Sequence, residues 1–293
     1  MFDIGELLEP LTLAEATAAL QAQPGLKVIA GGTDVLIRLQ HGHLAGTGLL
    51  SLRAIPGLDE IRREPNGTLW IGAMATFAQI HRDPLVLEHV PILAEAAVAM
   101  GGPQVRNVAT IGGNICNGAV SGDSASTLFA LDAALRLESQ DGMRLVPIAE
   151  FYAGPGQVNL AEGELLTAIL IRPDSYRGAA GTYIKFAMRK AMDIATLGVA
   201  AVCRVRDGRF LDLSIALGVA APVPIRCPEA ENYARGREVS WECIQEIATL
   251  AVKPSRARTS WRASKDYREH LIEVLTQRAV AEAVRRAGGC HGQ

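Results

Sequence analysis

Two pairs of adjacent glycines constrain the fold of this chain more than any other feature of its sequence. The first pair, at positions 31–32, follows the apolar run at 27–30, and the second, at 112–113, lies within ATIGGNICNGAVSGD at 109–123. Paired glycines cost backbone entropy, so a stable fold keeps them where φ is positive or where another backbone or a ligand comes close. Successive amides in such turns form an anion-binding concavity. We therefore predict two phosphate-sized sites of exposed amides, which together suit a diphosphate.

The residues around the first pair predict a strand, a glycine loop and a helix, in that order. KVIA at 27–30 reads as the strand, GGTD at 31–34 as the loop, and VLIRLQHG at 35–42 as a short helix. This order places the loop amides at the N-terminus of a helix, where the helix dipole also favours an anion. The flanking elements thus support the predicted anion site.

The rest of the chain predicts an α+β protein of two domains. Capping boxes at Thr12 and Thr76 and a cap at Ser124 predict three helices, and Asp141-Gly142 predicts a hairpin. Three further strands are expected at 182–189, 195–205 and 210–221, and helices are expected from Pro228 onward, ending with one from Ser264 to Ala287. Strands in one block followed by helices in another indicate an α+β module. The Pro, Asp, Ser and Gly residues between Arg172 and Gly178 predict a boundary that divides the chain into 1–176 and 177–293.

Composition and charge exclude several classes of protein. With 293 residues, 49% of them hydrophobic and 20% charged, the chain can bury a full core. The formal net charge of −2 gives no global field for nucleic acid or an anionic membrane. The local basic stretch at 253–268 reads as helical, which favours a solvated face or a subunit contact. No apolar run approaches the ~20 residues that span a bilayer, and the N-terminus MFDIGELLEP carries no secretory signal, so we expect a cytoplasmic protein.

The cysteines indicate neither a disulfide framework nor a metal site. Their number is odd, they are scattered, and no CxxC pair occurs; they are Cys116, Cys203, Cys227, Cys243 and Cys290. We expect most of them to be buried, inert thiols. No metal-binding residues are predicted anywhere in the chain.

No familiar catalytic or nucleotide-binding motif accompanies the glycine pairs. The sequence contains neither GxxxxGK[ST] nor GxGxxG, which disfavours a P-loop and a doubly wound NAD fold. A GxSxG nucleophile elbow and an HExxH zinc motif are also missing. Phosphate sites without visible acid–base or nucleophilic groups favour a cofactor that supplies the chemistry itself. The plain alternative is that each glycine pair is only a tight turn.

Three runs of the sequence carry a resemblance to a known family. AGGTDVLIRL at 30–39, GGPQVRNVATIGGNICNGAVSGDSAS at 101–126 and YIKFAMRKAMDIATLG at 183–198 together resemble the FAD-binding subunits of the molybdenum hydroxylases. The likeness covers essentially the whole chain. It is closest to the separate FAD subunits of the bacterial xanthine dehydrogenases, which MFDIGELLEP and SWRASKDYREHLI at 260–272 also resemble. The implied fold is a vanillyl-alcohol-oxidase (PCMH) type FAD-binding domain of two subdomains, followed by a C-terminal domain of a three-stranded sheet and helices.

The resemblance also implies a set of residues that bind FAD without a covalent bond. The family's first pyrophosphate loop matches Val28, Ile29, Ala30, Gly31, Gly32, Thr33, Asp34 and Val35, and its second matches Thr110, Ile111, Gly112, Gly113 and Asn114. Further cofactor-contacting positions match Met100, Asp123, Leu166 and Lys185. Asp123 matches the acid at the sugar end of the nucleotide, where a hydroxyl can donate to a carboxylate. Met100 stands where relatives place an aromatic residue, and Lys185 lies on a strand of the second domain, so FAD would bridge the two domains.

The function implied by the resemblance is electron transfer within a larger enzyme. A molybdenum-cofactor subunit hydroxylates the substrate, a 2Fe-2S subunit relays electrons, and the flavin subunit passes them to NAD or oxygen. We therefore expect an oxidoreductase subunit in a heterotrimer or a multiple of it, with NAD as the acceptor and no nucleic acid or membrane partner. The loop at 187–193 is expected to border the approach of NAD.

Three other functions remain open at this point. The chain could be a self-sufficient flavin oxidoreductase of the same fold, or the FAD subunit of an aldehyde, carbon monoxide or N-heterocycle hydroxylase. It could also be a non-enzymatic protein that binds a partner and whose glycine turns are structural. Turnover by the isolated chain would indicate the first of these, and a colourless protein that takes up no FAD would indicate the last.

Overall fold

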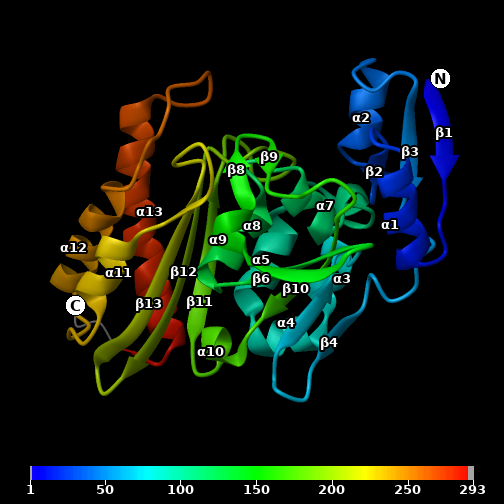
Figure 1. The fold of residues 1–293 in the computed structure, drawn as a ribbon. Coiled ribbons are helices and arrows are strands. Elements are labelled where there is room, and N and C mark those ends of the chain that lie inside the picture. The colour runs from blue at the N-terminus through cyan, green and yellow to red at the C-terminus, as the bar shows by residue number, and fades with distance from the viewer. Residues whose placement is uncertain (1, 290–293) are drawn as a thin grey trace.

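The N-terminal unit occupies one end of the molecule in this computed structural model, which describes residues 2–289 (Figure 1). Its parallel sheet has the order β1 (Ile4–Leu8), β3 (Thr47–Ser51) and β2 (Lys27–Ile29). The helices α1 (Leu13–Ala22) and α2 (Val35–Gln40) connect these strands. Parallel neighbours need such crossover connections. The predicted order of strand, glycine loop and helix is thus confirmed.

A five-stranded antiparallel sheet forms the middle of the molecule. Its order is β4 (Ile61–Arg63), β5 (Leu69–Gly72), β10 (Leu165–Ile171), β6 (Ala134–Ser139) and β7 (Gly142–Pro147). The predicted turn at Asp141-Gly142 joins β6 to β7. A small ribbon of β8 (Tyr152–Gly154) and β9 (Gln157–Val158) precedes β10. This sheet and the ribbon carry one wall of the site described below.

A group of short helices packs against this sheet and builds the main core. They are α3 (Phe77–Arg82), α4 (Pro84–His89), α5 (Pro91–Ala99), α6 (Pro103–Arg106), α7 (Ile111–Cys116), α8 (Asp123–Ala130) and α9 (Ile148–Phe151). The capping box at Thr76 is confirmed: its hydroxyl accepts from Gln79 N, and the Gln79 side chain accepts from Thr76 N. The predicted cap at Ser124 is wrong, because α8 begins after Gly122 and Ser124 lies inside its first turn.

The C-terminal part is a sheet covered by helices. Its strands are β11 (Ala180–Phe186), β12 (Leu197–Arg206), β13 (Arg209–Gly218) and β14 (Ile225–Arg226), in that order, and α10 (Pro173–Tyr176) leads into it. The three predicted strands are confirmed, and the two-residue β14 extends the sheet beyond them. The helices that follow are α11 (Pro228–Ala234), α12 (Trp241–Val252) and α13 (Lys265–Arg286). The basic stretch at 253–268 is helical only from Lys265, so its predicted helical context is wrong for the first part.

Strand β12 explains why this part of the sequence is so continuously apolar. Side chains alternate between the two faces of a strand. Val199 and Ala201 belong to the core under the C-terminal helices, whereas Ala200 and Val202 belong to the core that also holds α5 and α8. The sheet is therefore buried on both faces, and it fixes the C-terminal part against the central part.

Candidate functional site

The two glycine pairs lie on the wall of one large cavity. Its volume is about 1010 Å³, which lies at the upper end of the range for small-molecule sites and suits a dinucleotide. Most of the residues singled out in the sequence line it: Val28, Ala30, Gly31, Gly32, Thr33, Asp34, Val35, Met100, Thr110, Gly112, Gly113, Asn114 and Leu166. Four do not: Ile29, Ile111, Asp123 and Lys185. Residues as far apart in sequence as Val28 and Leu166 are thus brought together at one site.

The first glycine loop presents free backbone donors. The amides of residues 31–34 donate no hydrogen bond to any other residue that the structure describes. Gly32 has a φ of +78°, a conformation that L side chains rarely adopt. A run of unpaired amides that face a cavity is suited to an anion. The first predicted anion site is therefore available.

The second glycine pair does not present free amides, and this prediction is wrong. Gly112 and Gly113 lie in the first turn of α7, not in an open loop. Gly112 N donates to Ala73 O at 2.8 Å, and Gly113 N donates to Thr110 Oγ1 at 3.1 Å. The amides of Ile111 and Asn114 are also paired, with Ala75 O and Thr110 O. Thr110 caps the helix by accepting from the amides of Gly113 and Asn114, so these amides are not free to bind a phosphate as the sequence suggested.

The glycines of both pairs allow two backbones to pass close to each other. A Cβ added to Gly31 would stand 1.8 Å from Val108 O, just before the second glycine stretch. A Cβ added to Gly112 would stand 2.6 Å from both the Cβ and the carbonyl oxygen of Ala73. These gaps are far shorter than any van der Waals contact. Gly31 thus joins the first loop to the second, and Gly112 joins the second to the end of β5.

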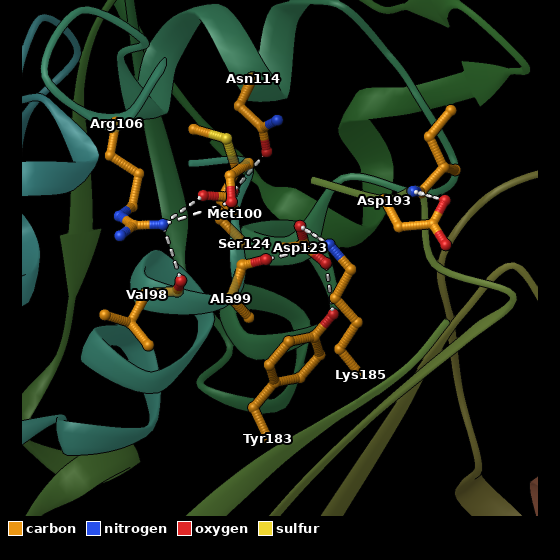
Figure 2. A network of polar contacts seen from close by, with 12 residues as sticks. Val98, Ala99, Met100, Arg106, Asn114, Asp123, Ser124, Tyr183, Lys185 and Asp193 are labelled. Carbon is orange, nitrogen blue, oxygen red and sulfur yellow. Dashed lines mark hydrogen bonds and ion pairs between the residues drawn. The ribbon is translucent and has the colours of Figure 1, made fainter. Parts of the chain in front are cut away.

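Side-chain donors complete the lining between the two loops. Asn114 lines the cavity, and its Oδ1 atom accepts a hydrogen bond of 2.8 Å from Ser124 Oγ, which leaves Asn114 Nδ2 as a donor without a partner among the described residues (Figure 2). Asn117 Nδ2 donates to Asp34 Oδ1 at 3.2 Å and so links the two loops. No described partner engages the Thr33 hydroxyl. With the free amides, these groups form a polar end of the cavity suited to a diphosphate.

Arg106 holds the cavity wall at Met100. Its Nη1 atom donates to Val98 O at 3.1 Å and to Met100 O at 3.0 Å, as Figure 2 shows. These carbonyls lie at the C-terminal end of α5, where the helix leaves carbonyl groups unpaired and where a positive charge is favoured. Arg106 therefore fixes the backbone of Met100, which lines the cavity.

Asp123 and Lys185 form a buried ion pair instead of part of the cavity wall. Lys185 Nζ lies 2.8 Å from Asp123 Oδ2 and also donates to Ala99 O, and Tyr183 Oη donates to Asp123 Oδ1 at 2.9 Å (Figure 2). Burial raises the pKa of the Asp123 carboxyl above its ordinary value, although Lys185 and Tyr183 act in the opposite direction. Burial and the Asp123 charge raise the pKa of Tyr183, which keeps that hydroxyl protonated as a donor. The pair thus joins β11 to α8 behind the cavity.

Several residues of the site were not identified from the sequence. Tyr183 lies two positions before Lys185 on the same strand, so the alternation of a strand could have placed both on one face. Arg106 carries no local signal, and neither do the residues at 156–158 and 160–165, which line the cavity. Cys116 also lines the cavity, and burial raises its thiol pKa to about 12, which makes it a poor nucleophile at neutral pH.

Two absences apply to residues 2–289. No group of three or more His, Cys, Asp or Glu side chains is placed there to hold a metal ion. Within the same residues, every helix is too short or too polar to span a bilayer. The four cysteines described, all except Cys290, are free, and three of them are buried.

Comparison with known proteins points to one family along the whole chain. A model described as the FAD binding domain in molybdopterin dehydrogenase matches residues 2–173, and one described as the CO dehydrogenase flavoprotein C-terminal domain matches residues 182–283. The chain is 43% identical over 289 residues, or 99% of either chain, to a putative xanthine dehydrogenase FAD-binding subunit of Escherichia coli K12. It is 32% identical to the nicotinate dehydrogenase FAD-subunit of Eubacterium barkeri, over 93% of this chain and 96% of that one.

The fold agrees with the sequence comparison. A chain of carbon monoxide dehydrogenase from Hydrogenophaga pseudoflava superimposes with a TM-score of 0.92 at 31% identity, over 98% of this chain and 99% of that chain. The expected α+β architecture, a PCMH-type FAD-binding domain followed by a C-terminal domain, is therefore confirmed.

Proposed function

The chain belongs to the FAD-binding family of the molybdopterin dehydrogenases, and on that premise we propose that it is the flavin subunit of a xanthine dehydrogenase that delivers electrons to NAD. The observation that carries the proposal is the cavity of about 1010 Å³ with unpaired amides at one end. The 43% identity to a putative xanthine dehydrogenase subunit favours xanthine over the other substrates of the family. The proposal also includes a cytoplasmic location.

The residues present fit FAD. The amides of residues 31–34, the Thr33 hydroxyl and Asn114 Nδ2 would hold the diphosphate, and the apolar wall at Met100 and Leu166 would pack against the rest of the cofactor. Ile29 and Ile111 would support the two loops from behind. Asp123 and Lys185 do not line the cavity. They would therefore contact the cofactor only if their ion pair rearranged when FAD binds. Bound FAD supplies redox chemistry that no side chain of the chain can provide.

The chain's own contribution is to bind, to orient and to limit access. The close approach of Gly31 to Val108 fixes the spacing of the two loops, and Arg106 fixes Met100. The raised pKa of the Cys116 thiol removes a competing nucleophile from the wall. No group in the site needs to transfer a proton for this role, which agrees with the lack of an acid–base motif in the sequence.

We further propose that the partners are a molybdenum-cofactor subunit and a 2Fe-2S subunit, in a heterotrimer or a multiple of it. One solved structure of similar fold is a chain of carbon monoxide dehydrogenase, which supports a multisubunit oxidoreductase of this kind. We also propose that the chain divides into domains at 1–176 and 177–293. The ranges matched by the two family models, 2–173 and 182–283, support this boundary.

Purification of the chain with its native partners tests this function. We expect the absorption bands of oxidised flavin, a molybdenum subunit and a 2Fe-2S subunit in the preparation, and xanthine-dependent reduction of NAD. The isolated chain should take up FAD without oxidising xanthine. A colourless chain that binds no added FAD would overturn the proposal. Xanthine oxidation by the isolated chain would instead identify a self-sufficient flavin enzyme, and reduction of oxygen alone would remove NAD as the acceptor.

Arg189 gives a test of the proposed approach of NAD. The loop between β11 and β12 is held by its own contacts, since Asp193 Oδ2 accepts from Arg189 N at 2.9 Å and Asp193 Oδ1 accepts from Ile194 N. The Arg189 side chain is largely exposed, and its Nη2 atom donates to Met192 O at 2.6 Å. We expect Arg189→Ala to raise KM for NAD about three- to tenfold, through loss of a phosphate-pairing cation, and to leave xanthine oxidation with an artificial acceptor unchanged. Unchanged KM and kcat with NAD in this variant and in Asp193→Ala would remove the loop from the NAD path.

A further inference from the structure

A second cavity lies between the central part of the molecule and the C-terminal sheet. Its volume is about 400 Å³, and it shares no lining residue with the larger cavity. It is lined from β4, from the junction of α4 and α5, from the segment between α10 and β11, and from the end of α13. Figure 1 shows α10 and β4 at the lower edge of the molecule, away from α7. The cavity therefore joins the two parts of the chain at a place that the flavin site does not use.

The lining of this second cavity is strongly cationic. Arg63, Arg177 and Arg286 contribute to it together with His89, whereas Glu88 is the one carboxylate that residues 2–289 place in its lining. Arg286 is paired with Glu95 and Glu282. The other two arginines make no ion pair with any acid in residues 2–289. A cavity with two uncompensated guanidinium groups attracts an anion.

The two unpaired arginines are held close to each other. A Cβ added to Gly67 would stand 2.5 Å from Arg177 Nη2 and 3.4 Å from Arg63 Nη2, so both guanidinium groups lie against the same point of the backbone. The acids nearest to Arg63 in sequence, Glu60 and Glu64, are both paired with Arg62 and do not compensate it. Two guanidinium charges that lie against one point of the backbone repel each other, and an anion between them would offset that repulsion.

Tyr176 fixes this arrangement. Tyr176 is buried and lines the cavity, its hydroxyl donates to Gly67 O, and Arg63 Nε donates to the same hydroxyl at 3.4 Å. The His89 ring lies against Tyr176, with 5.3 Å between ring centroids. Both arginines are exposed, but their contacts with the backbone at Gly67 and, for Arg63, with the Tyr176 hydroxyl position them beside the cavity.

We propose that this second cavity binds a small molecule that carries a phosphate or diphosphate group, distinct from the flavin. Paired guanidinium groups match the oxygens of a phosphate in a bidentate geometry. The volume of about 400 Å³ exceeds that of a bare phosphate and lies within the range of small-molecule sites. Because Arg63 comes from β4 and Arg177 from the segment that leads into β11, the bound molecule bridges the central and C-terminal parts of the chain.

Calorimetric titration of the full chain, saturated with FAD, with pyrophosphate and with inorganic phosphate at fixed ionic strength tests this inference. Saturation with FAD prevents the probes from binding at the first glycine loop. We expect the affinity for pyrophosphate to fall at least tenfold in R63Q/R177Q. The matched control R82Q/R235Q, which removes two exposed arginines outside both cavities, should bind pyrophosphate as the natural chain does. R177K, which keeps the charge but not the planar fork, should bind with intermediate affinity.

Two results of this titration would count against the site. Failure of the natural chain to bind either probe, or equal affinity in R63Q/R177Q and in the natural chain, would overturn the inference. The arginines are exposed, so we expect all variants to fold; R177Q alone gives the same comparison with the smallest change to the fold. The flavin content of R63Q/R177Q should equal that of the natural chain, which separates this site from the proposed flavin function.

Discussion

The variant Gly31→Ala is expected to fold but to bind little or no flavin. The added Cβ would stand 1.8 Å from Val108 O and 2.7 Å from the carbonyl carbon of Val108, so the two loops must move apart. Neither neighbour is a flexible side chain that can turn away. Overpacking of this kind costs about 1–3 kcal/mol of stability. The displaced loop carries the unpaired amides at 31–34, which would bind the diphosphate of FAD. We expect their displacement to lower the affinity for FAD more than about tenfold, since a loss of only about 1.4 kcal/mol of binding free energy corresponds to that factor.

The measurement is the ratio of flavin absorbance to protein absorbance after reconstitution with FAD, together with a urea unfolding curve. Gly154→Ala is the matched control. Gly154 lies in β8 next to Ala153, which lines the cavity, and its φ is not positive. The nearest atom to an added Cβ is the flexible Gln157 Oε1 at 3.6 Å. That variant should bind FAD normally. Full flavin content and unchanged stability in Gly31→Ala would show that the two loops do not set the geometry of the site.

The glycine pairs also show how far the sequence could predict this site. Local patterns identified the strand before the first pair, the helix after it and the free amides between them, because these features depend on neighbours in the chain. The second pair was misjudged because the amides of Gly112 and Gly113 bond to Ala73 O and Thr110 Oγ1, and Ala73 lies about 40 residues away in sequence. A glycine pair looks the same in a sequence whether it exposes amides or admits another backbone.

The resemblance to a family supplied the positions that local patterns could not. Asp123 and Lys185 are unremarkable charges in the sequence, and only their shared ion pair shows that they belong together. Their partners come from α8, α5 and β11, and such convergence depends on packing between distant elements. The overall architecture was easier to predict, since it follows from the order of strands and helices. The extra strand β14 has only two residues, too few for any periodic signal.

Lys185→Met is expected to destabilise the protein by about 3–5 kcal/mol, because it leaves the Asp123 carboxylate buried without its cation. The side chains of Asp123 and Lys185 are 6% and 12% exposed, so water cannot replace the lost partner. Replacement of both residues in Asp123→Asn/Lys185→Met should recover most of that loss. Lys190→Met removes an equal charge from an exposed position and serves as the control. We expect it to change stability by no more than about 0.5 kcal/mol.

The stability of Lys185→Met should also depend on pH, in a direction that the pKa of Asp123 determines. Burial raises the pKa of Asp123 in the folded protein, and loss of Lys185 removes the main opposing influence, so the pKa rises further. Between the ordinary pKa of an aspartate and this raised value, the folded protein binds more protons than the unfolded chain. The free energy of unfolding of Lys185→Met should therefore increase as the pH falls from about 8 toward 5. The natural chain and Lys190→Met should show a weaker change over that range. Urea unfolding of the three proteins at several pH values measures this dependence. The predicted role of the buried ion pair would be wrong if Lys185→Met were as stable as Lys190→Met. It would also be wrong if the free energy of unfolding of Lys185→Met fell as the pH was lowered from about 8 to 5.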